Sequence, residues 1–112
     1  MATADPQTER AVRLFLDRIG IRYPVASARL FGSRARGTHA SDSDADLAVI
    51  LIGEPGDAVA VGIDMAGIAF DVMLDADVLV SPLPIWEADW AKPEMYANPR
   101  LLENIRREGI TV

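Results

Sequence analysis

The sequence contains no cysteine, which excludes disulfide bonds and thiolate-bound zinc. No apolar run approaches the roughly 18 residues that suggest a membrane-spanning helix. The first residues are polar and acidic, unlike the basic and then apolar start of a secretory signal. We therefore expect neither a membrane protein nor a secreted one. The absence of cysteine is compatible with a cytoplasmic protein.

The chain is also short of positive charge. It has 11 Lys and Arg residues against 17 Asp and Glu residues, which gives a formal net charge of −6 at pH 7. Because non-specific binding to nucleic acid depends on neutralising phosphates, this balance argues against direct DNA binding. The basic residues nevertheless cluster, and a local positive patch on an acidic protein suits a single triphosphate better than a polymer. The clustered residues are Arg29, Arg34, Arg36, Arg100, Arg106 and Arg107.

Two segments open with a capping side chain followed by proline, a pattern typical of helix starts. They are Asp5-Pro6 and Asn98-Pro99. Apolar residues then recur at helical spacing until a glycine ends each segment. The sequence therefore predicts helices over about 6–19 and about 99–108.

Three apolar segments, at about 25–32, 45–52 and 78–80, are predicted as strands. Pro82 and Pro84 should stop the third strand, because proline cannot donate to a sheet.

The segment 57–76 is ambiguous, because its apolar residues keep helical spacing while those of 68–74 also alternate as in a strand. Length favours a helix, since twenty residues without proline exceed an ordinary strand. The segment from Trp86 to Ala97 is expected to be irregular or to hold a short helical turn. We expect residues 1–112 to form one α/β domain with a small mixed sheet.

The most informative pattern joins Gly32-Ser33 to two acids that follow ten residues later, Asp44 and Asp46. Residues i and i+2 of a strand point to the same face, so the two carboxylates would project together beside a turn with free backbone N–H groups. Such a site suits a divalent cation carrying a nucleoside triphosphate. The acids would hold the metal, and the turn and the following helix start would take the phosphates.

These residues resemble the GS-x10-DxD signature of the DNA polymerase β-like nucleotidyltransferase superfamily. The chain looks most like its minimal nucleotidyltransferase (MNT) branch. The run from Gly32 to Gly37 fits the branch's Gly-Ser-x-Ala-Arg-Gly pattern, and Ser41 to Leu47 fits its Ser-Asp-x-Asp-x-Asp-Leu pattern. Residues 104–110 also look like the closing segment of such proteins, whereas residues 53–97 are the least similar.

The resemblance implies a polymerase β palm-like fold, ATP as substrate and Mg²⁺ or Mn²⁺ as cofactor. It makes Asp44 and Asp46 the catalytic residues and metal ligands. The same resemblance implies a nucleotide-binding set, which consists of Gly32, Ser33, Arg34, Arg36 and Ser43.

Stand-alone MNT proteins are typically encoded beside a helical HEPN ribonuclease toxin, bind it, and neutralise it by adding AMP to a tyrosine. The resemblance therefore implies an antitoxin with a HEPN-like partner. The 112 residues leave no evident second domain for a small substrate, which also favours a protein acceptor. A small-molecule nucleotidyltransferase would need an additional domain or a homodimer.

Active members of the superfamily generally carry a third carboxylate, on the strand after the second helix. In the preferred register Ser81 takes that position, and a neutral hydroxyl cannot compensate a second dication. A shifted register would offer Asp77, and a strand at 68–74 would offer Asp71. The alternative to an enzyme is an MNT-fold module that neutralises its partner by contact alone.

Several neighbours of the motif have simpler expected roles. Asp42 is expected to form a turn, and Ser33 to cap a short helix that starts near Arg34. Arg36 is expected either to pair with Asp42 or Asp44 or to touch substrate. His39 is expected to be exposed.

Trp86 and Trp90, four residues apart, should form either an exposed ridge that meets a partner or part of the core.

Overall fold

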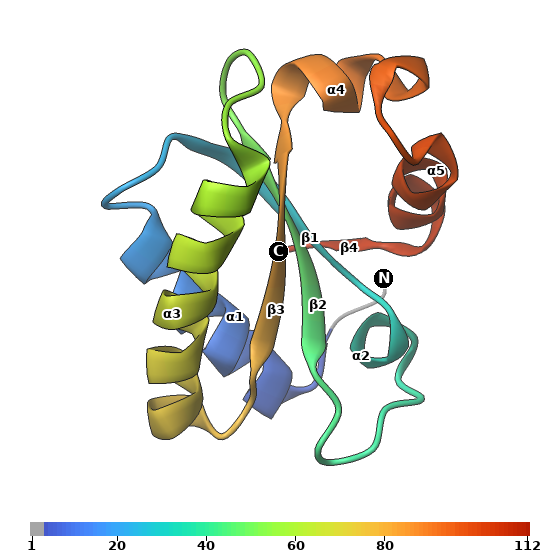
Figure 1. The fold of residues 1–112 in the computed structure, drawn as a ribbon. Coiled ribbons are helices and arrows are strands. Elements are labelled where there is room, and N and C mark those ends of the chain that lie inside the picture. The colour runs from blue at the N-terminus through green and yellow to red at the C-terminus, as the bar shows by residue number, and fades with distance from the viewer. Residues whose placement is uncertain (1–3) are drawn as a thin grey trace.

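The computed structural model describes residues 4–112 and contains one four-stranded sheet with the order β3-β2-β1-β4 (Figure 1). Strands β1 (Val25–Phe31) and β2 (Ala45–Leu51) run antiparallel, and β3 (Val80–Trp86) runs parallel to β2. The short strand β4 (Ile110–Thr111), which was not predicted, pairs antiparallel with β1. The expected α/β fold with a small mixed sheet is therefore confirmed.

Helices α1 (Pro6–Ile19) and α3 (Ala58–Ala76) cover one face of the sheet, here called the α1/α3 face (Figure 1). Helix α5 (Pro99–Glu108) lies on the other, the α5 face. Each face has its own buried cluster. On β2 the alternation is clear, because Leu47 and Val49 belong to the cluster with α1 and α3, whereas Ala48 belongs to the cluster with α5.

Both predicted helix starts are confirmed. The Asp5 carboxylate accepts a hydrogen bond from the Thr8 backbone N–H at 2.9 Å, and the Asn98 side chain accepts one from Leu101 at 3.3 Å. Proline follows each cap. These caps satisfy N–H groups that have no acceptor inside the helix, and so they fix where α1 and α5 begin.

The ambiguous segment is a helix, and only some of its apolar residues face the sheet. Helix α3 buries Met65, Ala69 and Val72 on the α1/α3 face. In contrast, Ile63 is 70% exposed and Phe70 is 53% exposed. Helical spacing thus identified the helix, but apolar residues on more than one side of it left the buried face to be decided by packing against the sheet.

The expected end of the third strand was wrong, because β3 runs through both Pro82 and Pro84 to Trp86. The strand lies at the edge of the sheet and pairs only with β2. Residues on a strand alternate in the direction of their backbone N–H, so the two prolines can both place their nitrogen at the open edge. No ladder hydrogen bond to β2 is lost.

After β3 the chain forms two short helical segments, α4 (Glu87–Ala91) and the 3₁₀ helix η1 (Pro93–Met95), in line with the expected short helical turn. Trp86 and Trp90 form no common ridge, because they pack against the clusters on opposite faces. Trp90 lies beneath the guanidinium of Arg106, 4.1 Å from the ring centre. None of the helices in residues 4–112 is long and apolar enough to cross a membrane.

Candidate functional site

The Gly-Ser turn and the two acids meet at one end of the sheet, where β1 ends and β2 begins (Figure 1). Asp46 is the second residue of β2 and lies opposite Phe31, the last residue of β1. Asp46 and Ala48 are two residues apart on the strand, so both point to the α5 face. Asp44 precedes Asp46 by two residues. The structure therefore brings the motif residues together, although Asp44 lies just before the strand and strand alternation places only Asp46.

Gly32 packs directly against the Asp46 carboxylate. A Cβ atom at this glycine would lie closer to Oδ2 of Asp46 than real Cβ atoms approach any atom. Its backbone also has a φ of 75°, which L side chains rarely adopt. Glycine is therefore required here for two independent reasons, the positive φ and the space that the Asp46 carboxylate occupies.

The short helix α2 (Ser33–Arg36) begins immediately after this glycine. The N–H groups of Ala35 and Arg36 both donate to the Gly32 carbonyl at 3.2 Å. Those of Ser33 and Arg34 come earlier and have no acceptor within the helix. Gly32, not Ser33, occupies the capping position, and no side chain caps this helix. Two backbone donors are thus available beside the acids.

Asp46 is half-buried and Asp44 is exposed. Burial raises the pKa of Asp46 above its ordinary value of 3.8, the charge of Asp44 raises it further, and Arg36 opposes both effects. Burial is the larger cause of the raised pKa of Asp46, and the added effect of Asp44 places the two carboxylates near each other. A cation would relieve the repulsion between them.

Arg34 does not point toward a nucleotide. Its side chain is buried, and all three nitrogen atoms bind within the protein. Nε donates to the Ser43 carbonyl at 2.7 Å, Nη2 to the Ser41 carbonyl at 3.1 Å, and Nη1 to the Thr8 hydroxyl at 2.8 Å. We therefore assign Arg34 to holding the loop that carries the acids, in place of the expected contact with nucleotide.

Thr8 and Asp5 extend this anchor to the start of α1, a role that was not predicted. The Thr8 hydroxyl donates to Oδ2 of Asp5 at 2.8 Å, and the same oxygen lies 3.1 Å from Nε2 of His39. His39 is therefore half-buried against α1, contrary to the expected exposure, and it contacts neither acid of the motif. The cap pattern at Asp5 was visible in the sequence, but its reach to the loop was not.

Arg36 and Ser43 also make contacts inside the protein. Nη1 of Arg36 lies 3.8 Å from Oε2 of Glu108 at the end of α5, so neither of the expected partners, Asp42 and Asp44, pairs with it. The Ser43 hydroxyl accepts from the Ala40 backbone N–H at 3.0 Å and closes a turn in the loop. Arg36 remains half-exposed and within electrostatic reach of Asp46.

Ser81 lies directly beside Asp46 in the parallel pairing of β2 and β3. It shares the α5 face with Leu83, two residues later. The preferred register, which put a serine at the third-acid position, agrees with this pairing.

Neither alternative third ligand joins the two acids. Among residues 4–112, no three His, Asp or Glu side chains are grouped so that they could hold a metal ion. Asp71 lies on α3, which packs on the opposite face of the sheet, because 68–74 is helical. Asp77 caps the end of α3, before β3 begins. The carboxylates available to a cation here are therefore two, Asp44 and Asp46.

Comparison with known proteins agrees with this geometry. A profile of the nucleotidyltransferase domain family matches residues 12–72, more than half of the chain. No curated protein matches the sequence. Among solved structures, a Sulfolobus solfataricus protein assigned as a nucleotidyltransferase is similar in fold, with a TM-score of 0.53 and 17% identity over 99% of this chain and 89% of the other. The chain therefore belongs to the nucleotidyltransferase domain family.

Proposed function

We propose that this nucleotidyltransferase transfers AMP from ATP to a hydroxyl group on a partner protein. The observation that carries the proposal is the pair Asp44 and Asp46, which lie close together at the start of β2 near the free N–H groups that open α2. The resemblance to MNT proteins suggests the partner, a HEPN-like toxin whose tyrosine is the acceptor. The chain would then be the antitoxin of a toxin–antitoxin pair that acts in the cytoplasm.

Mg²⁺ or Mn²⁺ fits the two acids, because carboxylate oxygens suit these hard cations and the two carboxylates lie near each other. Asp44 and Asp46 would hold the ion. When bound, it would supply positive charge that offsets the charge of the triphosphate. The N–H groups of Ser33 and Arg34 would take phosphate oxygens, and Gly32 leaves room for the Asp46 carboxylate.

In the reaction, the oxygen of the acceptor hydroxyl forms a bond to the α-phosphorus of ATP. The bond from that phosphorus to the bridging oxygen breaks, and pyrophosphate leaves. The acceptor hydroxyl also gives up its proton. Ser81 stands where the family usually has its third carboxylate, and a serine hydroxyl is a poor base. The proton would pass to water or to a group that the partner supplies.

The same serine supports a second candidate function, a binding module that neutralises its partner by contact. Ser81 lies beside Asp46, and within residues 4–112 no third acid completes the site. Such a module would keep the fold and the partner surface but would transfer nucleotide slowly or not at all.

One experiment separates the two functions. The purified chain is incubated with α-labelled ATP, Mg²⁺ and the purified product of the adjacent reading frame, and the label is then sought on a tyrosine of that partner. The enzyme predicts labelling that Asp44→Asn with Asp46→Asn abolishes. The variant Asp42→Asn is a matched control, since it removes an exposed acid of the same loop.

The same double variant is then tested in cells that produce the partner. Loss of protection, with the complex still formed, supports transfer as the function. Full protection by the double variant, or an unlabelled partner beside a stable wild-type complex, contradicts transfer and favours the binding module.

A further inference from the structure

A pocket lies at the opposite end of β3 from the acids. Its volume is about 260 Å³. Ser81 pairs with Asp46, whereas Trp86 of the pocket pairs with Leu51 at the end of β2. Five residues of strand, roughly 17 Å at about 3.3 Å per residue, separate the two places. The pocket is therefore distinct from the nucleotide site.

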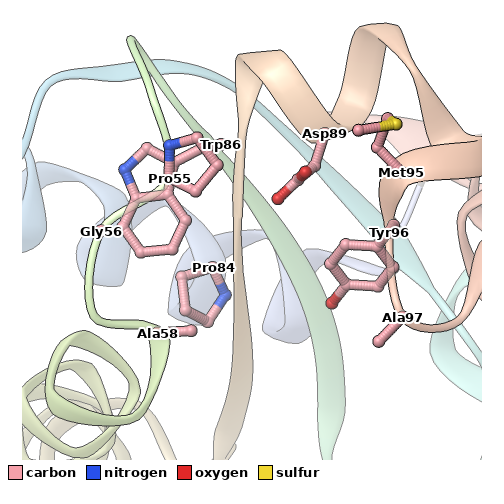
Figure 2. Close-up of a pocket in the computed structure, with 9 residues that line it drawn as sticks. All are labelled: Pro55, Gly56, Ala58, Pro84, Trp86, Asp89, Met95, Tyr96 and Ala97. Atoms are coloured by element: carbon pink, nitrogen blue, oxygen red, sulfur yellow. The ribbon is translucent and has the colours of Figure 1, made fainter.

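The pocket spans both sides of the edge strand (Figure 2). Trp86 and Pro84 line it on one side, and Tyr96, Met95 and Asp89 on the other. Aromatic rings and a carboxylate that line one cavity form a favourable environment for a cation, because the ring faces carry partial negative charge.

The backbone at this edge cannot receive an added strand in the ordinary way. Pro84 has no N–H to donate, and the residue is buried. A partner would have to engage the pocket through side chains.

The segments around the pocket are rich in acids, whereas Arg29 and Arg106 lie against Trp90, the residue after Asp89. Residues 53–61 and 86–97 contain one basic residue, Lys92, and five acids, which are Glu54, Asp57, Glu87, Asp89 and Glu94. Two of these acids already accept backbone hydrogen bonds, Asp57 from Ala60 and Glu87 from Gly53.

Asp89 lines the pocket and, within residues 4–112, takes part in no hydrogen bond or ion pair of its side chain. Its charge affects Tyr96, which also lines the pocket. Burial raises the pKa of Tyr96, and the carboxylate of Asp89 raises it further. The one acid that lines the pocket is therefore free to meet an incoming cation.

We propose that this pocket, here called the Trp86 pocket, binds the guanidinium of an arginine that is flanked by apolar residues on a partner protein. Arginine fits better than lysine, because its planar group stacks on aromatic rings and can offer two donors to the Asp89 carboxylate. The inference goes beyond nucleotide transfer and requires neither nucleotide nor metal.

The test is an NMR titration of the ¹⁵N-labelled chain with the peptide acetyl-Leu-Arg-Leu-amide, without nucleotide or metal. The indole N–H signal of Trp86 should shift. That of Trp90, which lies under Arg106 outside the pocket, should stay in place and serves as an internal control. The peptide with citrulline in place of arginine keeps the shape without the charge and should bind at least about tenfold more weakly.

Two variants then test whether the Asp89 carboxylate is the group that binds the arginine peptide. Asp89→Asn should weaken the arginine peptide roughly tenfold, whereas Glu94→Gln, which removes a nearby acid outside the lining, should change the affinity less than about twofold. Equal binding of the arginine and citrulline peptides to the wild-type chain would overturn the proposal. A shift of the Trp90 signal alone would also overturn it, as would equal losses of affinity in Asp89→Asn and Glu94→Gln. The same holds if the Trp86 signal does not shift at about 20 mM peptide, the range of weak binding. Because these measurements contain no ATP, their failure leaves the proposed transferase activity unaffected.

Discussion

Gly32 and Asp46 are coupled at the scale of single residues. The glycine has a φ of 75° and leaves the space that the Asp46 carboxylate fills. Gly37, five residues later, has nearly the same φ of 74° but open space around it. Comparing substitutions at Gly32 and Gly37 therefore distinguishes the effect of backbone strain from that of the contact with Asp46.

Gly32→Ala is expected to destabilise the fold by about 3 kcal/mol, and Gly37→Ala by about 1 kcal/mol, because both strain the backbone but only the first also clashes with Asp46. Denaturant unfolding measures both. In an Asp46→Ala background, the cost of Gly32→Ala should fall toward that of Gly37→Ala. An unchanged cost in that background would show that the carboxylate is not what requires the glycine.

The ionisation of Asp46 should weaken the fold. Because burial and Asp44 raise its pKa in the folded state, the unfolded chain releases this proton at lower pH than the folded chain does. The resulting loss of unfolding free energy is absent at pH values below about 3.8, the ordinary pKa. It is fully present once the pH exceeds the raised pKa of Asp46.

Asp46→Asn should therefore stabilise the chain at pH 7 by about 0.5–1 kcal/mol, allowing for solvent screening of a half-exposed group. The gain should vanish near pH 3.5, where both states hold the proton. Urea unfolding at the two pH values provides the comparison, with Asp42→Asn as the control for loss of a loop charge. If Asp46→Asn made the chain less stable at pH 7, ionisation of Asp46 would not be destabilising and this prediction would be wrong.

At the scale of elements, the loop between α2 and β2 is fixed by contacts to α1 and not by its own sequence alone. Arg34 binds the carbonyls of Ser41 and Ser43 and reaches Thr8, which Asp5 holds in turn. The start of α1 and the loop thus form one hydrogen-bonded unit. This unit determines where Asp44 stands relative to Asp46.

Arg34→Lys should loosen this unit, because a single ammonium cannot reach two loop carbonyls and the Thr8 hydroxyl in the geometry of a guanidinium. We expect a loss of about 2 kcal/mol in unfolding free energy and faster hydrogen exchange of the amides of 37–44. Arg36→Lys, whose 3.8 Å ion pair with Glu108 is half-exposed, should cost less than about 0.5 kcal/mol. Equal effects of the two substitutions would contradict the role assigned to Arg34.

At the scale of the whole molecule, the sheet ends on one side at β3, whose outer edge is open. An open edge can pair with another chain and cause aggregation. Pro82 and Pro84 remove alternate donors from this edge while leaving the pairing with β2 intact. The prolines therefore protect the molecule at the point where its sheet is incomplete.

Replacing both prolines with threonine should restore the missing donors and promote association through β3. Sedimentation velocity at increasing protein concentration should show larger species for Pro82→Thr with Pro84→Thr than for the wild type. Pro55→Thr, a change in a loop, serves as the control. A double variant that sediments like the wild type would show that the edge is protected by something else.

Local sequence patterns were enough to predict the starts of two helices and the position of the motif. Caps at Asp5 and Asn98 place the starts of α1 and α5, because a side-chain acceptor three residues before a free N–H is a local interaction. Strand alternation is also local, and it places Asp46 on the α5 face, with Asp44 just before the strand.

Other properties depend on neighbours that are distant in the sequence, and no local pattern predicts them. Pro82 lies within a strand because β3 is at an edge, and edge position follows from sheet order. Arg34 turned inward because Thr8, 26 residues earlier, lies beside it and a buried guanidinium needs acceptors for its donors. Ser81 stands beside Asp46 because the pairing of β2 with β3 sets the register, and no pattern within either strand specifies that pairing.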